Sequence, residues 1–244
     1  MKLACASSSL HRDIASGELT QLEFVDICAR DLACDGVVLD VRHFPRTDDD
    51  YLAQVKKMTT DRGLSIAALE DATFLSATRG EMAAVLGRAV TLGAPLVASP
   101  LARDVDLPWS EQLERLGTAT SLAKAANVTI AVRNAPQTYA AGTHDCKRVA
   151  KEADSAWLRF GPEPQRFDAA SDPRALQPNT VLLWSDAALQ TDRSIADTID
   201  AFAAFRGHVA VTDASGASTA AALAAAIGRW RAALAATTEM PNRT

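Results

Sequence analysis

Short apolar runs rich in Val, Ile, Leu and Ala alternate with helical stretches eight times along the chain of 244 residues. The predicted strands cover residues 2–7, 36–41, 65–70, 94–99, 129–134, 155–160, 180–185 and 208–212. Eight strand-then-helix units in about 250 residues is the pattern of a (β/α)8 barrel. We therefore expect an α/β fold with a single TIM barrel domain over residues 1–244, and functional side chains at the carboxyl ends of its strands.

Helix starts are marked by their capping residues. Thr20 with Glu23 and Thr78 with Glu81 have the spacing of capping boxes, which predicts helices beginning at these two places. Further helices are expected from about residue 47, from 108 and 143, over 195–205 and over 219–234, and the tail from Thr237 is expected to fray. Prolines crowd the segment after the sixth strand, which leaves room only for a short helix or an irregular loop: Pro162, Pro164, Pro173 and Pro178.

Alternation along each strand predicts which side chains face the barrel interior, because successive residues point to opposite sides. The large branched residues, such as Ile130 and Val132, are expected to face the helices, and Ala67 falls on the same side. The side chains then expected to point inward include Ala68, Ala131, Trp157 and Thr212, together with five charged residues: Asp40, Arg42, Glu70, Arg133 and Arg159. All five charged residues lie near the carboxyl ends of their strands, so we expect them at the mouth of the barrel.

Composition narrows the range of partners. A net charge of −5 argues against a nucleic-acid-binding surface, and the longest apolar stretches, 181–184 and 220–227, are too short to span a membrane. The four cysteines form no CxxC pair, which indicates reduced thiols and a cytoplasmic protein. The sequence is compatible with a homodimer.

Three segments resemble the xylose isomerase-like barrels, a superfamily of sugar isomerases and epimerases, sugar-phosphate isomerases and endonuclease IV. They are residues 34–40 (CDGVVLD), 130–136 (IAVRNAP) and 156–162 (AWLRFGP), and the order of elements resembles that superfamily over the whole chain. The resemblance implies a (β/α)8 fold and a sugar isomerase- or epimerase-like activity at the mouth.

The metal ligands that the resemblance implies are replaced in this chain. Arg133 stands where the family has a metal-binding Glu, although the following Asn134 is kept, and Arg159 stands where an Asp is usual. The last strand ends in Thr212-Asp213 rather than Glu, and the seventh lacks a His, with Asp186 matching an acidic residue there. Because two guanidinium groups repel a divalent ion, we expect no metal and no other cofactor.

Arginine at these positions suggests a different ligand chemistry. A guanidinium binds phosphate or carboxylate through paired hydrogen bonds, so the expected partner is a small molecule carrying such a group. The predicted binding residues are Arg42, Arg133, Asn134, Arg159 and Asp186, and the predicted acid/base residues are Asp40, His43 and Glu70. The alternative is that the arginines form a structural ion-pair lattice with the neighbouring carboxylates and bind nothing.

Three functions are therefore consistent with the sequence. The first is a sugar or sugar-phosphate isomerase- or epimerase-like enzyme that works without the family metal. The second is a catalytically inactive barrel that binds a small anion or sugar in a structural or regulatory role. The third, an endonuclease IV-like repair nuclease, is the weakest, because that chemistry needs a cluster of metal ligands and a basic surface.

Overall fold

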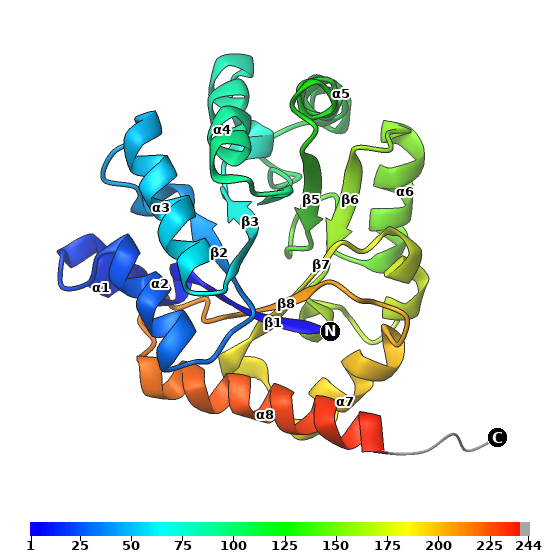
Figure 1. Ribbon diagram of the computed structural model, residues 1–244. Coiled ribbons are helices and arrows are strands. Elements are labelled where there is room, and N and C mark those ends of the chain that lie inside the picture. Colours follow the sequence, from blue (N-terminus) through cyan, green and yellow to red (C-terminus); the bar gives the residue numbers. More distant parts are fainter. Residues whose placement is uncertain (240–244) are drawn as a thin grey trace.

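The computed structural model describes residues 1–239, and its strands form one parallel sheet curled into a barrel (Figure 1). The strand order is β6-β5-β4-β3-β2-β1-β8-β7. The strands are β1 Lys2–Ala6, β2 Gly36–Asp40, β3 Ser65–Glu70, β4 Leu96–Pro100, β5 Thr129–Arg133, β6 Leu158–Gly161, β7 Leu182–Asp186 and β8 His208–Thr212. The predicted TIM barrel is confirmed, and each predicted strand overlaps an observed one.

The barrel closes irregularly between β6 and β7. Phe160 of β6 forms an isolated parallel bridge with Thr180, which precedes β7, and the Val181 N–H donates to the Phe160 carbonyl at 3.0 Å. Further along, the Trp184 N–H donates to the carbonyl of Pro162 at 2.8 Å. The barrel is therefore nearly closed, with its weakest backbone pairing at this seam.

Helices surround the barrel, as Figure 1 shows. They are α1 His11–Ser16, α2 Gln21–Arg30, α3 Asp49–Asp61, α4 Arg79–Leu92, α5 Trp109–Ala126, α6 Thr143–Ala153, α7 Asp192–Ala201 and α8 Ala220–Glu239. Both predicted capping boxes are present, at the start of α2 and of α4. No helix within residues 1–239 has the length and apolar character that crossing a bilayer would require.

One prediction about the end of an element needs correction, and one short helix was not predicted. The strand β1 is followed by a 3-10 turn, η1 Ser7–Leu10, and then directly by α1. The helix α8 continues to Glu239, so residues 237–239 are helical rather than frayed, and the rest of the predicted tail lies outside the described residues.

Only 3-10 turns connect β6 to β7, as the prolines predicted. These are η4 Pro164–Arg166 and η5 Pro173–Asn179. The ring of α-helices therefore has a gap beside β6, and this gap matters for the cavity described further below.

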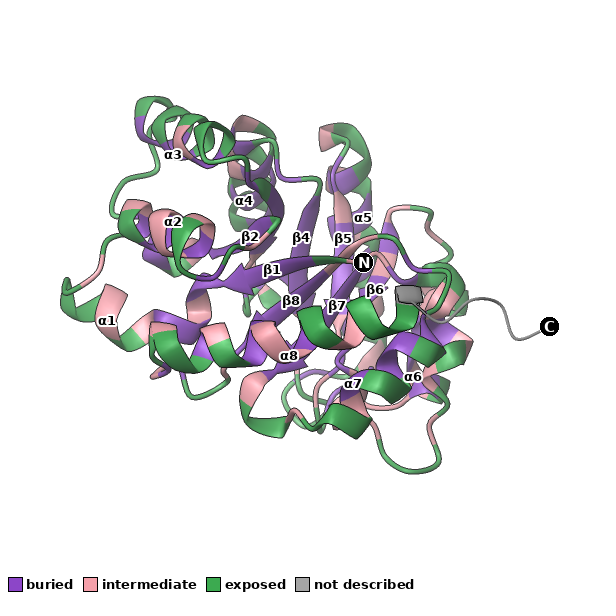
Figure 2. Ribbon diagram, turned by 60° about the horizontal axis from the view of Figure 1, so that its bottom comes forward, coloured by how far each residue is buried: buried purple, intermediate pink, exposed green. Residues whose placement is uncertain are grey.

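Two layers of side chains cover the two faces of the sheet, and the strands at the centre are almost wholly buried (Figure 2). The outer layer packs residues such as Leu39, Ile130 and Val132 against the helices. The inner layer is built mostly from alanines, with Val38, Leu96, Leu182 and Trp184. Small inner residues leave space near the centre of the barrel, and the Trp184 indole is the largest side chain that fills it.

A bulge explains one failure of the alternation rule. The pairing of β2 with β3 shifts between Val37 and Val38, so that Val38 faces Ala68 across the strands. As a result Ala67 and Ala68 both join the inner layer, and the prediction that Ala67 faces the helices is wrong.

Candidate functional site at the barrel mouth

A chain of alternating charges crosses the mouth from β3 to β7. Arg133, at the end of β5, donates from Nη1 to Glu70 Oε1 at 3.1 Å and from Nη2 to Glu163 Oε2 at 2.7 Å. Arg166, in η4, continues the chain by donating to Glu163 Oε1 at 2.6 Å and to Asp186 Oδ2 at 2.7 Å. Each of the two arginines therefore bridges two carboxylates that come from different strand ends.

Arg133 also lies over an aromatic ring. Its guanidinium carbon is 4.2 Å from the centroid of the Trp184 ring, which is a close cation–π contact. Gly161, paired with Arg133 across β5 and β6, makes room for this ring, because a Cβ there would lie 3.1 Å from the indole nitrogen of Trp184. Stacking and two ion pairs together fix the position of the Arg133 charge at the centre of the mouth.

The loop that carries Glu163 is held by Asn134. The Glu163 N–H donates to Asn134 Oδ1 at 2.6 Å, and Asn134 Nδ2 donates to the Glu163 carbonyl at 3.3 Å. Both residues are buried. Asn134 therefore fixes the backbone of Glu163 rather than reaching into the mouth, which gives the predicted binding residue a positioning role.

Glu70 is a carboxylate whose two oxygens both accept hydrogen bonds. Ser8 Oγ donates to its Oε2 at 2.7 Å, and Arg133 holds its other oxygen. Burial raises the pKa of Glu70, against the lowering effects of Arg133 and of the Ser8 hydroxyl. The Glu70 side chain is 14% exposed, so a ligand in the mouth can reach it, whereas the Glu163 side chain is fully buried.

Asp40 forms a separate pair with Arg42. Arg42 donates to both carboxylate oxygens through Nε and Nη2, and its backbone N–H donates to Asp40 Oδ1. The hydrogen bonds that Arg42 donates to Asp40 raise the pKa of Arg42. Because the Asp40 side chain is only 3% exposed, it is poorly placed to accept a proton from a ligand.

Two histidines and a serine form a line beside Asp40. Ser7 Oγ is 2.9 Å from His43 Nδ1, and His43 Nε2 is 2.9 Å from His11 Nδ1. The planes of the two rings are inclined by 23°, and the ring centroids are 5.2 Å apart. Burial lowers the pKa of His43 to about 4, so the predicted acid/base residue is neutral at pH 7.

The structure does not bring Arg159 to the mouth, so the predicted convergence of Arg133 and Arg159 is wrong. Arg159 Nη1 donates to the carbonyls of Ser155 and Leu158, at 3.4 and 2.9 Å, which places it at the starting end of β6. The reason is that β6 begins at Leu158 and not at 155, so Arg159 lies near the start of the strand instead of near its end. Trp157 precedes the strand and packs with the outer layer, so the prediction that it faces inward is also wrong.

Sequence reasoning missed three central members of the site: Glu163, Arg166 and Trp184. The first two were missed because the sixth strand was predicted to end at 160, which left Glu163 and Arg166 in an unassigned proline-rich loop. Alternation along β7 would have found Trp184, because it shares the inner face with Leu182. Asp186 is at the strand end where it was expected, and it pairs with Arg166.

Most arginines at and near the mouth are paired with carboxylates of the protein. The arginines near the strand ends have local carboxylate partners: Arg42 with Asp40, Arg46 with Asp48, Arg103 with Asp106, and Arg133 with Glu70 and Glu163. This pairing is the alternative that the sequence left open. Four carboxylates and three arginines make up the mouth, so its formal charge is about −1.

A divalent cation does not fit the residues at the centre of the mouth. The guanidinium of Arg133 takes the place between Glu70 and Glu163, and both carboxylates are already bonded to it. Within residues 1–239, no group of three or more His, Cys, Asp or Glu side chains is arranged to hold a metal ion. The charged residues at the centre of the mouth therefore act as ion pairs with one another rather than as ligands of a metal ion.

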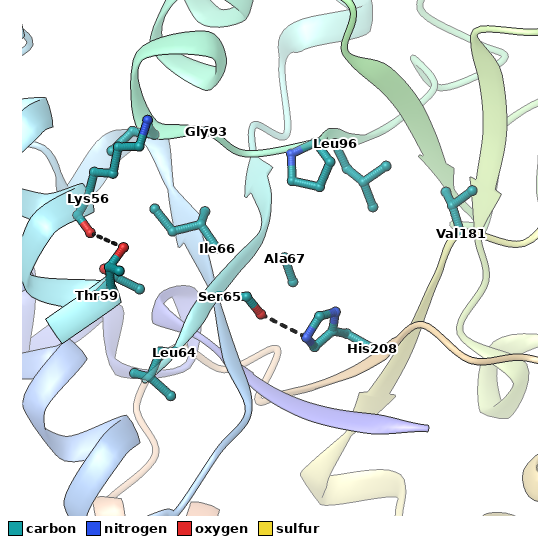
Figure 3. Close-up of a pocket in the computed structure, with 13 residues that line it drawn as sticks. Lys56, Thr59, Leu64, Ser65, Ile66, Ala67, Gly93, Leu96, Val181 and His208 are labelled. Carbon is teal, nitrogen blue, oxygen red and sulfur yellow. Dashed lines mark hydrogen bonds between the residues drawn. The ribbon is translucent and has the colours of Figure 1, made fainter. Parts of the chain in front are cut away.

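A separate cavity of about 500 Å³ opens at the opposite end of the barrel, where the strands begin (Figure 3). Ser65 of β3 and His208 of β8 meet there, with Ser65 Oγ 3.0 Å from His208 Nε2. Gly36 allows this contact, because a Cβ at that position would lie 2.8 Å from Ser65 Oγ. Burial and the nearby Lys2 lower the pKa of His208, and its hydrogen bond links strands that do not pair with each other.

Comparison with known proteins identifies the fold. No protein-family model matches the chain, and no curated protein matches it by sequence. Among solved structures, it is similar to D-psicose 3-epimerase from Clostridium cellulolyticum H10, with 13% identity, a TM-score of 0.77 and coverage of 98% of each chain. An L-ribulose 3-epimerase gives 17% identity and a TM-score of 0.75 over 99% of this chain and 98% of that one.

A putative xylose isomerase from Rhodospirillum rubrum gives 13% identity and a TM-score of 0.75, over 95% of this chain and 99% of that one. The chain therefore has the fold of the xylose isomerase-like TIM barrels. At these identities the likeness establishes the shared architecture, and the activity has to be argued from the site.

Proposed function

We propose that the protein is a sugar isomerase- or epimerase-like enzyme that binds a small carbohydrate at the barrel mouth and works without a divalent metal. The observation that supports this most directly is the Arg133 guanidinium, held between Glu70 and Glu163 and stacked on Trp184. It supplies a permanent positive charge at the centre of the mouth. The barrel that carries this mouth has the same fold as the sugar epimerases named above.

The proposed chemistry is proton transfer next to a sugar carbonyl. Glu70, reachable and with a raised pKa, would remove the proton from the carbon beside the carbonyl, because a raised pKa makes its carboxylate a stronger base. The N–H groups of Arg133 that are not bonded to carboxylates would stabilise the negative charge on the enediolate oxygen. Protonated Glu70 would then return the proton to the neighbouring carbon, while the hydroxyl proton of the enediolate moves from one sugar oxygen to the other, so no proton is gained or lost overall.

The exposure of the carboxylates bears on which reaction is favoured. Glu163 is fully buried and Asp186 is 4% exposed, so Glu70 is the most reachable of the three carboxylates that face the two bridging arginines. A single acid/base group moves a proton between neighbouring carbons on one face of the sugar, whereas epimerisation at one carbon needs groups on both faces. We therefore favour isomerisation of a ketose or aldose over epimerisation.

The charge balance bears on the ligand. The sequence-based expectation of a phosphate- or carboxylate-bearing ligand depended on arginines free to bind it, but Arg133 and Arg166 each bridge two carboxylates. An anion at the mouth would have to displace one of them. We propose a neutral sugar as the ligand, with hydroxyl groups that donate to Glu70 and accept from Arg133.

Hydrogen exchange into sugars tests this proposal. The protein is incubated with a panel of neutral ketoses and aldoses in D2O, and deuterium incorporation beside the carbonyl is followed by NMR. We expect exchange with at least one sugar, its loss in Glu70→Gln, and no change in Glu111→Gln, which alters an exposed carboxylate on α5. Calorimetry with the same sugars and their phosphates tests the preference for neutral ligands.

The second candidate is a catalytically inactive binding barrel. The closed chain of ion pairs favours it, because every carboxylate and arginine of that chain already has a partner within the protein. Sugar binding without any deuterium incorporation would support this second function and exclude the first.

A further inference from the structure

A second charged cavity lies away from the mouth, near the start of β6, where the 3-10 turn η5 rather than an α-helix packs against α6 and β6. It has a volume of about 470 Å³ and opens between α6, the start of β6 and η5. Its charged and amide-bearing lining residues are Lys147, Lys151, Asp154, Arg159 and Asn179. The cavity is distinct from the mouth, because Arg159 reaches it from the starting end of β6.

Backbone carbonyls hold the Arg159 guanidinium in place, and most of its N–H donors have no acceptor among the described residues. Its Nη1 donates to the carbonyls of Leu158 and Ser155, and these are the only hydrogen bonds of its guanidinium to described residues. Nε and Nη2 are therefore available to a ligand. The side chain is half-buried, so it lies in surroundings where a charge-assisted hydrogen bond is stronger than in open water.

The two lysines come from one face of α6. Lys147 and Lys151 are one helical turn apart, and neither has a described carboxylate within 4.0 Å. Of the acids nearest to them in sequence, Asp145 accepts from the Gly142 N–H at 3.0 Å, and Glu152 accepts from Arg148 at 2.8 Å and from the Trp109 indole at 2.6 Å. Both lysines can therefore turn toward an anion in the cavity.

The balance of charge around the cavity is positive even after the opposing groups are counted. Three cations line it against one carboxylate, that of Asp154, which also ends α6. The carboxyl end of α6 contributes about half a negative elementary charge. The net charge is then about +1.5, on a protein whose total formal charge is −5.

We propose that this cavity binds a phosphate compound, with Arg159 as its fixed donor and Lys147 and Lys151 as mobile counter-charges. The planar fork of Arg159 suits two phosphate oxygens, and the lysine ammonium groups act as point charges on the remaining oxygens. The cavity is larger than one phosphate needs, so a diphosphate or a phosphate ester fits it better than orthophosphate. The site does not depend on the activity at the mouth.

Calorimetry with inorganic pyrophosphate and orthophosphate, at low ionic strength, tests the site on the full chain. We expect pyrophosphate to bind more tightly than orthophosphate, and Arg159→Gln to weaken pyrophosphate binding by roughly tenfold or more, the value of a lost charge-assisted hydrogen bond. The matched control is Arg206→Gln, whose Nη1 likewise donates to backbone carbonyls, of Ala203 and Phe205, but which lines an apolar cavity.

Exposed variants keep the test valid if Arg159→Gln fails to fold. The double variant Lys147→Gln/Lys151→Gln changes two exposed side chains and should weaken pyrophosphate binding by about fivefold or more. Glu70→Gln should leave it unchanged, which separates this site from the mouth. No pyrophosphate binding to the wild type, or an equal loss in Arg206→Gln, would overturn the proposal.

Discussion

Arg133 Nη2 lies 2.7 Å from Glu163 Oε2, and the Glu163 side chain is fully buried. Glu163 also accepts from Arg166 at 2.6 Å, so one buried carboxylate holds two guanidinium groups from different elements. A buried charge with two partners is costly to disrupt, because removing it leaves both partners uncompensated. This arrangement predicts large effects for changes at Glu163 and at Arg133.

Replacing Glu163 should destabilise the fold strongly. Glu163→Ala removes the acceptor of two arginines at once, so we expect the free energy of unfolding to fall by about 3–5 kcal/mol. Glu163→Gln should cost less, because its amide oxygen still accepts one hydrogen bond. Urea unfolding followed by circular dichroism measures both variants.

An exposed ion pair provides the control for that experiment. Glu111 pairs with Arg115 at 2.8 Å on the surface of α5, and Glu111→Ala should cost about 0–1 kcal/mol. Similar losses for Glu163→Ala and Glu111→Ala would show that burial adds nothing to the mouth pair.

Removing the Arg133 side chain should create a binding site for a divalent cation at the mouth. Arg133→Ala leaves Glu70 and Glu163 facing a space with no shared positive charge, and carboxylate oxygens bind divalent cations. We expect millimolar Mn²⁺ to raise the melting temperature of this variant, at roughly 2–4 °C for each kcal/mol of stabilisation. The wild type should show no such rise.

Arg148→Ala is the control for the metal experiment, because it removes an arginine from the exposed pair with Glu152 on α6. If Mn²⁺ stabilises the wild type or Arg148→Ala as much as Arg133→Ala, then the cation does not bind between the two freed carboxylates.

The raised pKa of Glu70 gives a pH dependence whose sign can be worked out. The native state holds the Glu70 proton more tightly than the unfolded chain, where the reference pKa is 4.5. The contribution of this group to stability is therefore fully present below pH 4.5 and is lost as the pH rises through the folded pKa. Carboxyl NMR titration should show Glu70 titrating above ordinary glutamates.

The variant Ser8→Ala tests one of the contacts that set the pKa of Glu70. The Ser8 hydroxyl donates to Glu70 and lowers its pKa, so its removal should move the Glu70 titration further upward. Glu81, whose pKa is lowered by its hydrogen bonds with Thr78, is an internal reference that should not move. A downward shift of Glu70 in Ser8→Ala would contradict the assigned contact.

The barrel could be predicted from the sequence because strand-then-helix order and alternation depend on local patterns. The capping boxes at Thr20 and Thr78 gave two helix starts correctly for the same reason, since each needs only residues within one turn. Asp40, Glu70 and Arg133 were placed at the carboxyl ends of their strands correctly, because each of these strands ends within one residue of its predicted end.

The rest of the site depended on features without a local signal. The start of β6 at Leu158 and the bulge at Val38 moved Arg159 and Ala67 away from their predicted places. The role of Glu163 depends on Asn134, a distant residue that fixes its backbone, and no pattern within the proline-rich loop reveals that contact. Pairing between strand ends decides which arginines are free, and it becomes visible only in three dimensions.

The line of Ser7, His43 and His11 predicts a loss of stability in mild acid. Burial is the main cause that lowers the pKa of His43, from 6.5 to about 4, and the charge of Arg42 and the neighbouring His11 lower it further, against the raising effect of Asp40. The unfolded chain therefore binds a proton at His43 below about pH 6.5, where the native state does not. The stability linked to this group is present above pH 6.5 and falls as the pH drops toward 4.

His43→Gln should flatten this dependence, because glutamine cannot take up the proton in either state. Urea unfolding of the wild type at several pH values between 4.5 and 7.5, compared with the same series for His43→Gln, measures the difference as a change in slope. His144→Gln, which alters an exposed histidine in the first turn of α6, should keep the wild-type slope. If His43→Gln keeps that slope as well, then His43 takes up its proton at nearly the same pH in the folded protein as in the unfolded chain, and the protonated ring would donate from Nε2 to His11 Nδ1.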